Sequence, residues 1–129
     1  MDGKKKVLMI DDEEGFIEVI KLNLESTGYY EVMGLVNAKD TLATIYSFRP
    51  NVILLDMLMP EVSGLQVCEM LKDDPIGKDI PIIILSASGS DTSRIKAFKL
   101  KVSDYLEKPA EVGHIIRAIQ KALELGMAL

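Results

Sequence analysis

The segment Val52-Ile53-Leu54-Leu55-Asp56-Met57-Leu58-Met59-Pro60 indicates the type of fold, because four aliphatic residues run directly into one carboxylate. An unbroken aliphatic run of this length is typical of a strand that is buried on both faces, as in a parallel sheet. Asp56 then stands where the strand leaves the sheet, which is where ligands bind in open α/β folds. Taken alone, the segment is equally consistent with an aspartate that forms a turn.

The composition is that of one acidic globular domain. The chain has 129 residues, 48% of them hydrophobic, and a net charge of −5. This length suits a single core, so we expect residues 1–129 to form one domain. The acidic balance disfavours direct binding to nucleic acid or to an anionic membrane surface.

The cellular location is predicted from the single cysteine and from hydropathy. Cys68 excludes an internal disulfide and fits a reducing compartment, and its apolar neighbours Val67 and Leu71 indicate a thiol buried in the core. No apolar stretch is long enough for a membrane span or for the hydrophobic part of a signal peptide. We therefore predict a cytoplasmic protein.

Strand and helix patterns alternate along the chain, which predicts a parallel sheet with helices on both faces. Asn37 and Asp40 predict the start of one helix, and Ser63 with Gln66 forms a capping-box pattern for another. The strands are expected at residues 5–10, 30–35, 51–56, 80–85 and 104–107. The helices are expected at about 13–27, 38–48, 64–73, 91–100 and 111–125.

The last two predicted helices differ in the strength of their apolar faces. The helix at about 91–100 has only Ile95 and Phe98 as an apolar pair, so it is an element that shifts at low cost. The final helix has a full inner stripe of Val112, Ile116, Ile119 and Leu123.

Four of the five predicted strands end in a chemically active residue. Asp11 and Asp12 follow the first strand, Asp56 the third, Ser86 the fourth and Lys108 the fifth. A parallel sheet gathers all these ends at one edge. Three carboxylates beside one ammonium repel one another unless a cation joins them. Oxygen ligands alone favour a hard divalent ion, so we predict Mg²⁺.

A carboxylate, a divalent metal and an amine together suit phosphoryl transfer, in which the protein positions the group and offsets its charge. Asp56 is the predicted nucleophile because it lies centrally, with acids on one side and Ser86 and Lys108 on the other. Each residue also has an ordinary structural explanation, as a helix cap, a turn hydroxyl or a surface amine. Their coincidence at the strand ends of one sheet favours the chemical explanation.

With these residues in hand, the chain resembles the receiver domain of bacterial two-component response regulators, in particular those like the chemotaxis regulators. The resemblance covers essentially the whole chain. It is carried by the acidic pair Asp11-Asp12, by Asp56 to Pro60 with Gly64 soon after, by Ser86-Ala87, and by Asp104-Tyr105-Leu106-Glu107-Lys108-Pro109.

The resemblance implies a flavodoxin-like (βα)5 three-layer sandwich with a sheet of order 2-1-3-4-5. It implies a phosphoryl acceptor at Asp56 and Mg²⁺ held by Asp12, Asp56 and the main-chain carbonyl of Leu58, with Asp11 acting mainly through water. Lys108 would contact the phosphoryl oxygens, and the Lys108-Pro109 peptide bond is expected to be cis. Such a domain catalyses its own phosphorylation and dephosphorylation and is not a turnover enzyme.

The resemblance also implies partners and a switch. A sensor histidine kinase or a phosphotransfer protein would donate the group, Ser86 would turn toward it, and Tyr105 would swing inward. The expected output face consists of the fourth helix, the fifth strand and the fifth helix, and it would serve a homodimer or an output partner. Mixed charges are available there on Arg94, Lys99, Asp104, Glu107, Arg117 and Lys121.

Three features depart from the family pattern. Lys101-Val102 stands where Gly-Ala is usual, which disfavours a tight left-handed turn after the fourth helix. Ala110 replaces a usual Phe, which predicts looser packing at the start of the last helix. Leu58 and Ser88 flank the expected phosphoryl position and are expected to influence water access.

Three alternative functions share some of these features. A haloacid-dehalogenase-type phosphatase needs a second acid two residues after its nucleophile, where this chain has Leu58. A flavodoxin-like cofactor binder needs a phosphate-cradling loop, but the loop at residues 11–14 is entirely acidic. A docking module that is never phosphorylated stays open, although the complete set of acid, hydroxyl and lysine argues against it.

Overall fold

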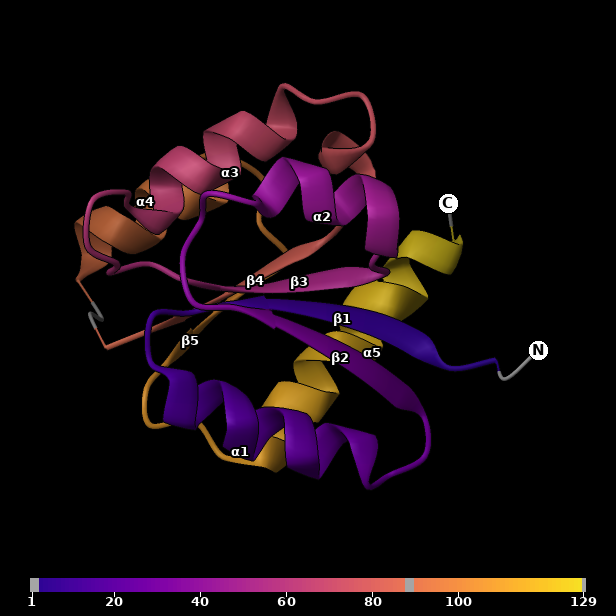
Figure 1. Ribbon diagram of the computed structural model, residues 1–129. Coiled ribbons are helices and arrows are strands. Elements are labelled where there is room, and N and C mark those ends of the chain that lie inside the picture. The colour runs from indigo at the N-terminus through magenta and orange to yellow at the C-terminus, as the bar shows by residue number, and fades with distance from the viewer. Residues whose placement is uncertain (1–2, 88–89, 129) are drawn as a thin grey trace.

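The computed structural model describes residues 3–87 and 90–128, and it shows a five-stranded parallel sheet between two layers of helices (Figure 1). The strand order is β2 (Tyr30–Leu35), β1 (Lys5–Ile10), β3 (Val52–Asp56), β4 (Ile82–Ser86) and β5 (Asp104–Glu107). Helices α1 (Glu14–Glu25) and α5 (Val112–Ala128) cover one face. Helices α2 (Thr41–Phe48), α3 (Gly64–Lys72) and α4 (Asp91–Lys99) cover the other. The predicted flavodoxin-like fold and strand order are confirmed.

The central strand divides its side chains between the two faces. Val52 and Leu54 pack with the α1 and α5 layer, while Ile53 and Leu55 pack with the α2, α3 and α4 layer. All four are fully buried, as the aliphatic run predicted. The sheet therefore has no solvated face at its centre, and the only polar residue of β3 is Asp56, at its end.

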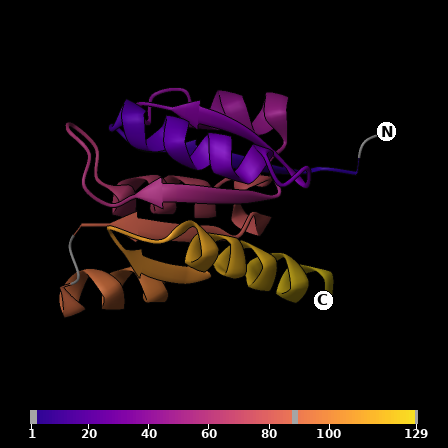
Figure 2. The same cartoon turned by 90° about the horizontal axis from the view of Figure 1, so that it is seen from below.

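The register brings the carboxyl ends of the strands to one edge. Ile10 pairs with Leu55, Asp56 with Leu85, and Ser86 with Glu107. Figure 2 shows the strand arrowheads pointing to one side of the molecule, away from the N and C labels. Residues that follow these strands are thus neighbours although they lie far apart in the sequence.

The apolar faces of the last two helices differ from the prediction. Ile95 and Phe98 of α4 are 56% and 48% exposed, whereas the small Ala97 is fully buried against the sheet. In α5 the fully buried positions are Ile115 and Ile119. Small residues at the contact let a helix lie close to the sheet, so the larger apolar side chains are displaced to the flanks. The predicted stripe residues Val112, Ile116 and Leu123 are accordingly only half-buried.

The helix starts agree with the sequence signals in one case of two. In α3 the predicted capping box is present, with Ser63 N donating to Gln66 Oε1 (2.9 Å) and Gln66 N to Ser63 Oγ (3.3 Å). The start predicted at Asn37 is wrong, because α2 begins at Thr41. Asn37 Oδ1 instead accepts a hydrogen bond from Lys39 N in a turn before the helix.

A left-handed residue follows α4 although the sequence disfavoured it. Lys101 has φ +62° and its N–H donates to the carbonyl of Phe98 (3.0 Å). The turn places Val102 in the core, where it is 6% exposed. It also lets Ser103 N donate a hydrogen bond to the carbonyl of Ile82 (2.7 Å). Burial of Val102 and this entry into β5 offset the cost of the lysine conformation. The Lys108-Pro109 peptide bond is cis, as the resemblance implied.

Within the described ranges, none of the helices has the length and apolar character needed to cross a bilayer.

Candidate functional site

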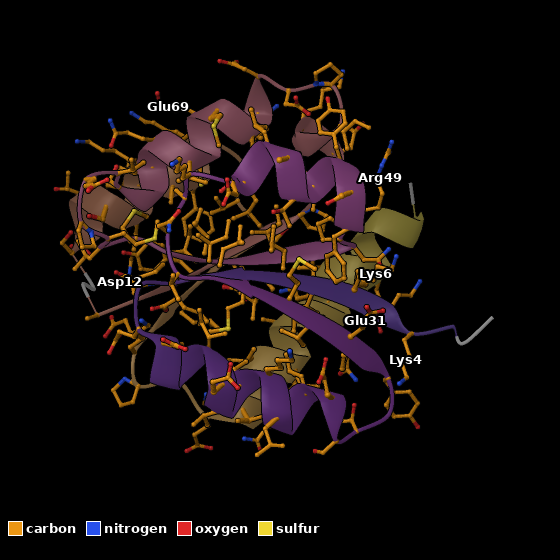
Figure 3. All side chains as sticks on the ribbon, in the orientation of Figure 1. Lys4, Lys6, Asp12, Glu31, Arg49 and Glu69 are labelled. Atoms are coloured by element: carbon orange, nitrogen blue, oxygen red, sulfur yellow. The ribbon has the colours of Figure 1, made fainter. Side chains whose placement is uncertain are left out.

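The predicted strand-end residues lie together at one edge of the sheet. Carboxylate oxygens of Asp11, Asp12 and Asp56 lie within 4.8 Å of one another. Lys108 Nζ donates to Asp11 Oδ2 (2.7 Å) and lies 3.9 Å from Asp56 Oδ1. Figure 3 labels Asp12 at this end of the sheet, whereas Lys4, Lys6 and Arg49 lie at the opposite end. The three acids and the amine therefore form one cluster.

Burial and charge raise the pKa of the central carboxyl group. Asp56 is 4% exposed, and burial together with the charge of Asp11 raises its pKa to about 6 against the opposing effects of Lys108 and the Leu58 N–H. Asp11 is only 1% exposed, whereas Asp12 faces solvent. The site thus keeps two acids in a confined environment and a third at its mouth.

Hydrogen bonds from the main chain fix the two buried carboxylates. Glu13 N donates to Asp11 Oδ1 (2.9 Å), and Leu58 N donates to Asp56 Oδ1 (3.2 Å). Each bond closes a short loop just after a strand, so the backbone holds each acid in one orientation.

Gly64 allows the loop after β3 to fold back beneath the acid. Its N–H donates to the carbonyl of Met57 (2.9 Å). A Cβ at this position would lie 2.5 Å from the Asp56 carbonyl oxygen and 2.8 Å from Met57 Cα. The start of α3 therefore contacts the backbone of Asp56 and Met57 so closely that only glycine fits.

The lysine has more acidic neighbours than the sequence predicted. Lys108 Nζ also donates to Glu13 Oε1 (2.9 Å) and lies 4.5 Å from the centre of the Phe16 ring. Burial lowers the pKa of Lys108, but the hydrogen bonds to Asp11 and Glu13 outweigh it and leave the pKa above its ordinary value. The amine is consequently charged at neutral pH. Glu13 and Phe16 follow the acidic pair directly, but their reach to Lys108 depends on side-chain conformations that spacing does not encode.

The hydroxyl and the tyrosine predicted for the switch lie on β4 and β5, the two strands on one side of β3. Ser86 is fully buried at the end of β4, and its carbonyl accepts a hydrogen bond from Lys108 N (2.8 Å). Tyr105 of β5 is 4% exposed, with the Arg94 guanidinium 4.8 Å from the centre of its ring. Its ring already occupies the inward position. Ser88, the other residue expected beside the phosphoryl position, lies outside the described residues.

The residues present fit a hard divalent cation. Three carboxylates from two strand ends converge, and the ammonium of Lys108 is shared among Asp11, Glu13 and Asp56. One amine does not balance this charge, and carboxylate oxygens are the ligands that Mg²⁺ selects. An acidic pocket of this kind is also where receiver domains generally bind Mg²⁺.

Comparison with known proteins agrees with this geometry. The family model described as the response regulator receiver domain matches residues 7–120. The phosphate regulon regulator PhoB of Pseudomonas aeruginosa is 34% identical over 119 residues, which cover 92% of this chain and 52% of PhoB. A receiver domain from Clostridium thermocellum has a TM-score of 0.87 and 29% identity, with 96% of this chain and 98% of that chain covered.

A solved structure of the chemotaxis protein CheY4 of Vibrio cholerae shares the fold at 24% identity, with a TM-score of 0.86 and coverage of 93% of this chain and 99% of that chain. The present chain belongs to the response regulator receiver family of two-component signalling. Phosphotransfer and switching are general to this family of signalling domains. The chain spans about half the length of the curated relatives PhoB, RpaA and PhoP.

Proposed function

We propose that Asp56 is the phosphoryl acceptor and that a sensor histidine kinase or a phosphotransfer protein is the donor. The observation that carries the proposal is the position of the Asp56 carboxylate. It is buried at the end of the central strand, within 4.8 Å of the Asp11 and Asp12 oxygens and 3.9 Å from Lys108 Nζ. These are the parts that phosphoryl transfer requires, namely a held nucleophile and groups that offset charge.

In the proposed step a carboxylate oxygen of Asp56 attacks phosphorus. The new O–P bond forms as the N–P bond of the phosphohistidine breaks, and the imidazole nitrogen keeps the electron pair. Lys108 offsets the charge of the phosphoryl oxygens. Asp12, Asp56 and the main-chain carbonyl of Leu58 would hold Mg²⁺, with Asp11 acting mainly through water, and the ion would supply further neutralisation of those oxygens. Hydrolysis of the acyl phosphate by water resets the site, so the domain acts on itself and is not a turnover enzyme.

The phosphoryl group then becomes the signal. It adds about −1.5 to −2 charge, and the Ser86 hydroxyl turns toward it while the Tyr105 ring, which is already buried, is held in its inward position. The rearrangement reaches the face formed by α4, β5 and α5, which serves an output partner or a homodimer. Arg94 and Glu107 on this face are already paired with each other (2.7 Å), so a charged group of a partner competes with that pair.

The unit that performs this function is the single receiver domain of residues 1–129, acting in the cytoplasm without direct contact to nucleic acid or membrane. The acidic net charge of −5 supports this part of the proposal.

Intact-mass spectrometry after incubation with acetyl phosphate and Mg²⁺ tests the assignment. The wild-type protein should gain one phosphoryl group, and Asp56→Asn should gain none because the amide is not a nucleophile. Asp40→Asn is the matched control, since Asp40 is exposed on a loop and makes no side-chain cap bond to the described helix α2. Persistent labelling of Asp56→Asn, or a wild-type protein that never gains the mass, contradicts the proposal.

A further inference from the structure

We propose that Glu13 is a positioning residue that holds the Lys108 ammonium away from Asp56 and competes for it with the incoming phosphoryl group. The inference rests on the proposed function, in which Asp56 accepts the group and Lys108 contacts its oxygens. It adds a third partner to that pair and assigns it a restraining effect on phosphoryl binding.

The distances define which carboxylates hold the amine. Lys108 Nζ is 2.7 Å from Asp11 Oδ2 and 2.9 Å from Glu13 Oε1, but 3.9 Å from Asp56 Oδ1. Two of its three N–H groups are therefore engaged by residues of the loop after β1. The Phe16 ring, 4.5 Å away, flanks the same position. The amine is thus held beside the acceptor but does not form a hydrogen bond with it.

The side chain of Glu13 does not make the hydrogen bond to the helix N–H groups that is usual at its position. Glu13 is the N-cap residue of α1, where a short polar side chain ordinarily accepts from the helix N–H groups. Its carboxylate makes no such bond within the described helix and contacts Lys108 instead. The backbone of Glu13 is meanwhile fixed, because its N–H donates to Asp11 Oδ1 and its carbonyl accepts from Phe16 N and Ile17 N. The fixed backbone of Glu13 and the direction of its side chain together place its carboxylate opposite the Lys108 ammonium.

Because Glu13 is much more exposed than Asp11, the ion pair between Lys108 and Glu13 is the one that breaks more easily. Asp11 is 1% exposed, whereas the Glu13 side chain is 64% exposed and regains water when the bond opens. A phosphoryl group at Asp56 brings a stronger negative charge, and Lys108 reaches it most easily by leaving Glu13. Glu13 therefore weakens phosphoryl binding by the energy of one exposed ion pair. Such pairs predict an effect of about two- to fivefold in affinity.

The affinity for beryllofluoride, an analogue of the phosphoryl group, measured by titration with saturating Mg²⁺, tests this inference. Glu13→Gln removes the charge, and we expect binding about two- to fivefold tighter than in the wild type. Glu14→Gln is the matched control. Glu14 is the next residue and is exposed in the first turn of α1, so its substitution removes the same charge without affecting a contact to Lys108. It should reproduce only the general effect of a less acidic surface.

A third variant separates contact from charge. Glu13→Asp keeps the carboxylate but shortens it by one methylene, and aspartate is a preferred N-cap, so the acid should turn to the helix N–H groups. We expect Glu13→Asp to bind beryllofluoride more tightly than the wild type, and more weakly than Glu13→Gln only by the general charge effect that Glu14→Gln measures. In parallel, ¹⁵N spectra of the lysine ammonium groups should show faster hydrogen exchange at Lys108 in both variants, and this readout does not depend on phosphorylation.

The outcomes are distinct. If Glu13→Gln binds no more tightly than Glu14→Gln, or if Glu13→Asp behaves like the wild type, the restraining contact is refuted while Asp56 stays the acceptor. Unchanged exchange at the Lys108 ammonium refutes it as well. If the wild type neither binds beryllofluoride nor gains a phosphoryl group, the proposed function fails and this inference fails with it.

Discussion

Gly64 lies where no side chain fits, at the junction between the loop that follows Asp56 and the start of α3. Its hypothetical Cβ meets three backbone atoms of Asp56 and Met57, which do not move aside as the end of a flexible side chain does. Any larger residue must therefore displace the loop that carries Asp56 or the start of α3. A glycine in this position serves the geometry of the site and not the flexibility of the chain.

We predict that Gly64→Ala destabilises the protein by about 1–3 kcal/mol, the usual cost of overpacking a rigid site. It should also slow phosphoryl uptake, because the loop between Asp56 and Gly64 shifts. Urea denaturation measures the first effect and the intact-mass assay the second. Gly15→Ala is the control, since a Cβ at Gly15 meets no described atom within 4 Å outside its own helix. Gly15 lies in α1, where alanine in place of glycine adds about 0.5–1 kcal/mol of stability. Equal stabilities of the two variants would contradict the close approach.

At the scale of the elements, α4 and its C-terminal turn combine weak packing with a strained residue. The helix buries Ala97 and leaves Ile95 and Phe98 half-exposed, and it ends in a lysine in the left-handed region. Both features lower the cost of moving α4 relative to α2 or α3. They lie on the face through which we propose that the signal leaves the domain.

We predict that Lys101→Gly stabilises the fold by about 0.5–1 kcal/mol, because the left-handed conformation costs a side chain about 1–2 kcal/mol and glycine returns part of this as chain entropy. Lys99→Gly, in the last turn of the same helix, should instead destabilise it by about 1 kcal/mol. Thermal denaturation of the two variants at equal concentration distinguishes them. A loss of stability in Lys101→Gly would show that the lysine side chain contributes more than its backbone costs.

The sequence predicted the elements whose signals are local, and it failed where packing decides. The aliphatic run of β3 and the Ser63-Gln66 capping box were sufficient to define their elements. The buried face of α4 was not, because small residues such as Ala97 carry no hydrophobic signal. The turn at Lys101 was disfavoured by propensity, yet burial of Val102 enforces it. Among the site residues, strand ends located Asp11, Asp12, Asp56, Ser86 and Lys108, but no spacing rule locates the Glu13 and Phe16 side chains that surround the amine.

For the molecule as a whole, the buried carboxyl group of Asp56 lowers the stability of the fold at neutral pH. The pKa of Asp56 is about 6, compared with about 3.9 in an unfolded chain. An acid whose pKa rises on folding binds its proton more tightly in the native state. Its contribution to stability is therefore present below about pH 4 and is lost as the pH rises through about 6.

We predict from this sign that Asp56→Asn, measured in EDTA, gains stability over the wild type at pH 7.5 and gains much less at pH 4.5. The difference should amount to about 1–3 kcal/mol, because each unit of pKa corresponds to about 1.4 kcal/mol. Denaturant unfolding at the two pH values measures it. A gain that is the same at both values would mean that packing, and not ionisation, distinguishes the amide from the acid.

Asp56 and Lys108 are positioned by strands that differ in their resistance to local unfolding. Asp56 ends β3, which lies at the centre of the sheet, while Lys108 follows β5, a four-residue strand at its border. Short border strands fray far more often than central ones, without the rest of the domain unfolding. Each such opening leaves Asp56 in place but moves the Lys108 ammonium away from it. The equilibrium between the paired and the open state of β4 and β5, which amide exchange would report, therefore sets the fraction of molecules in which Lys108 lies beside Asp56.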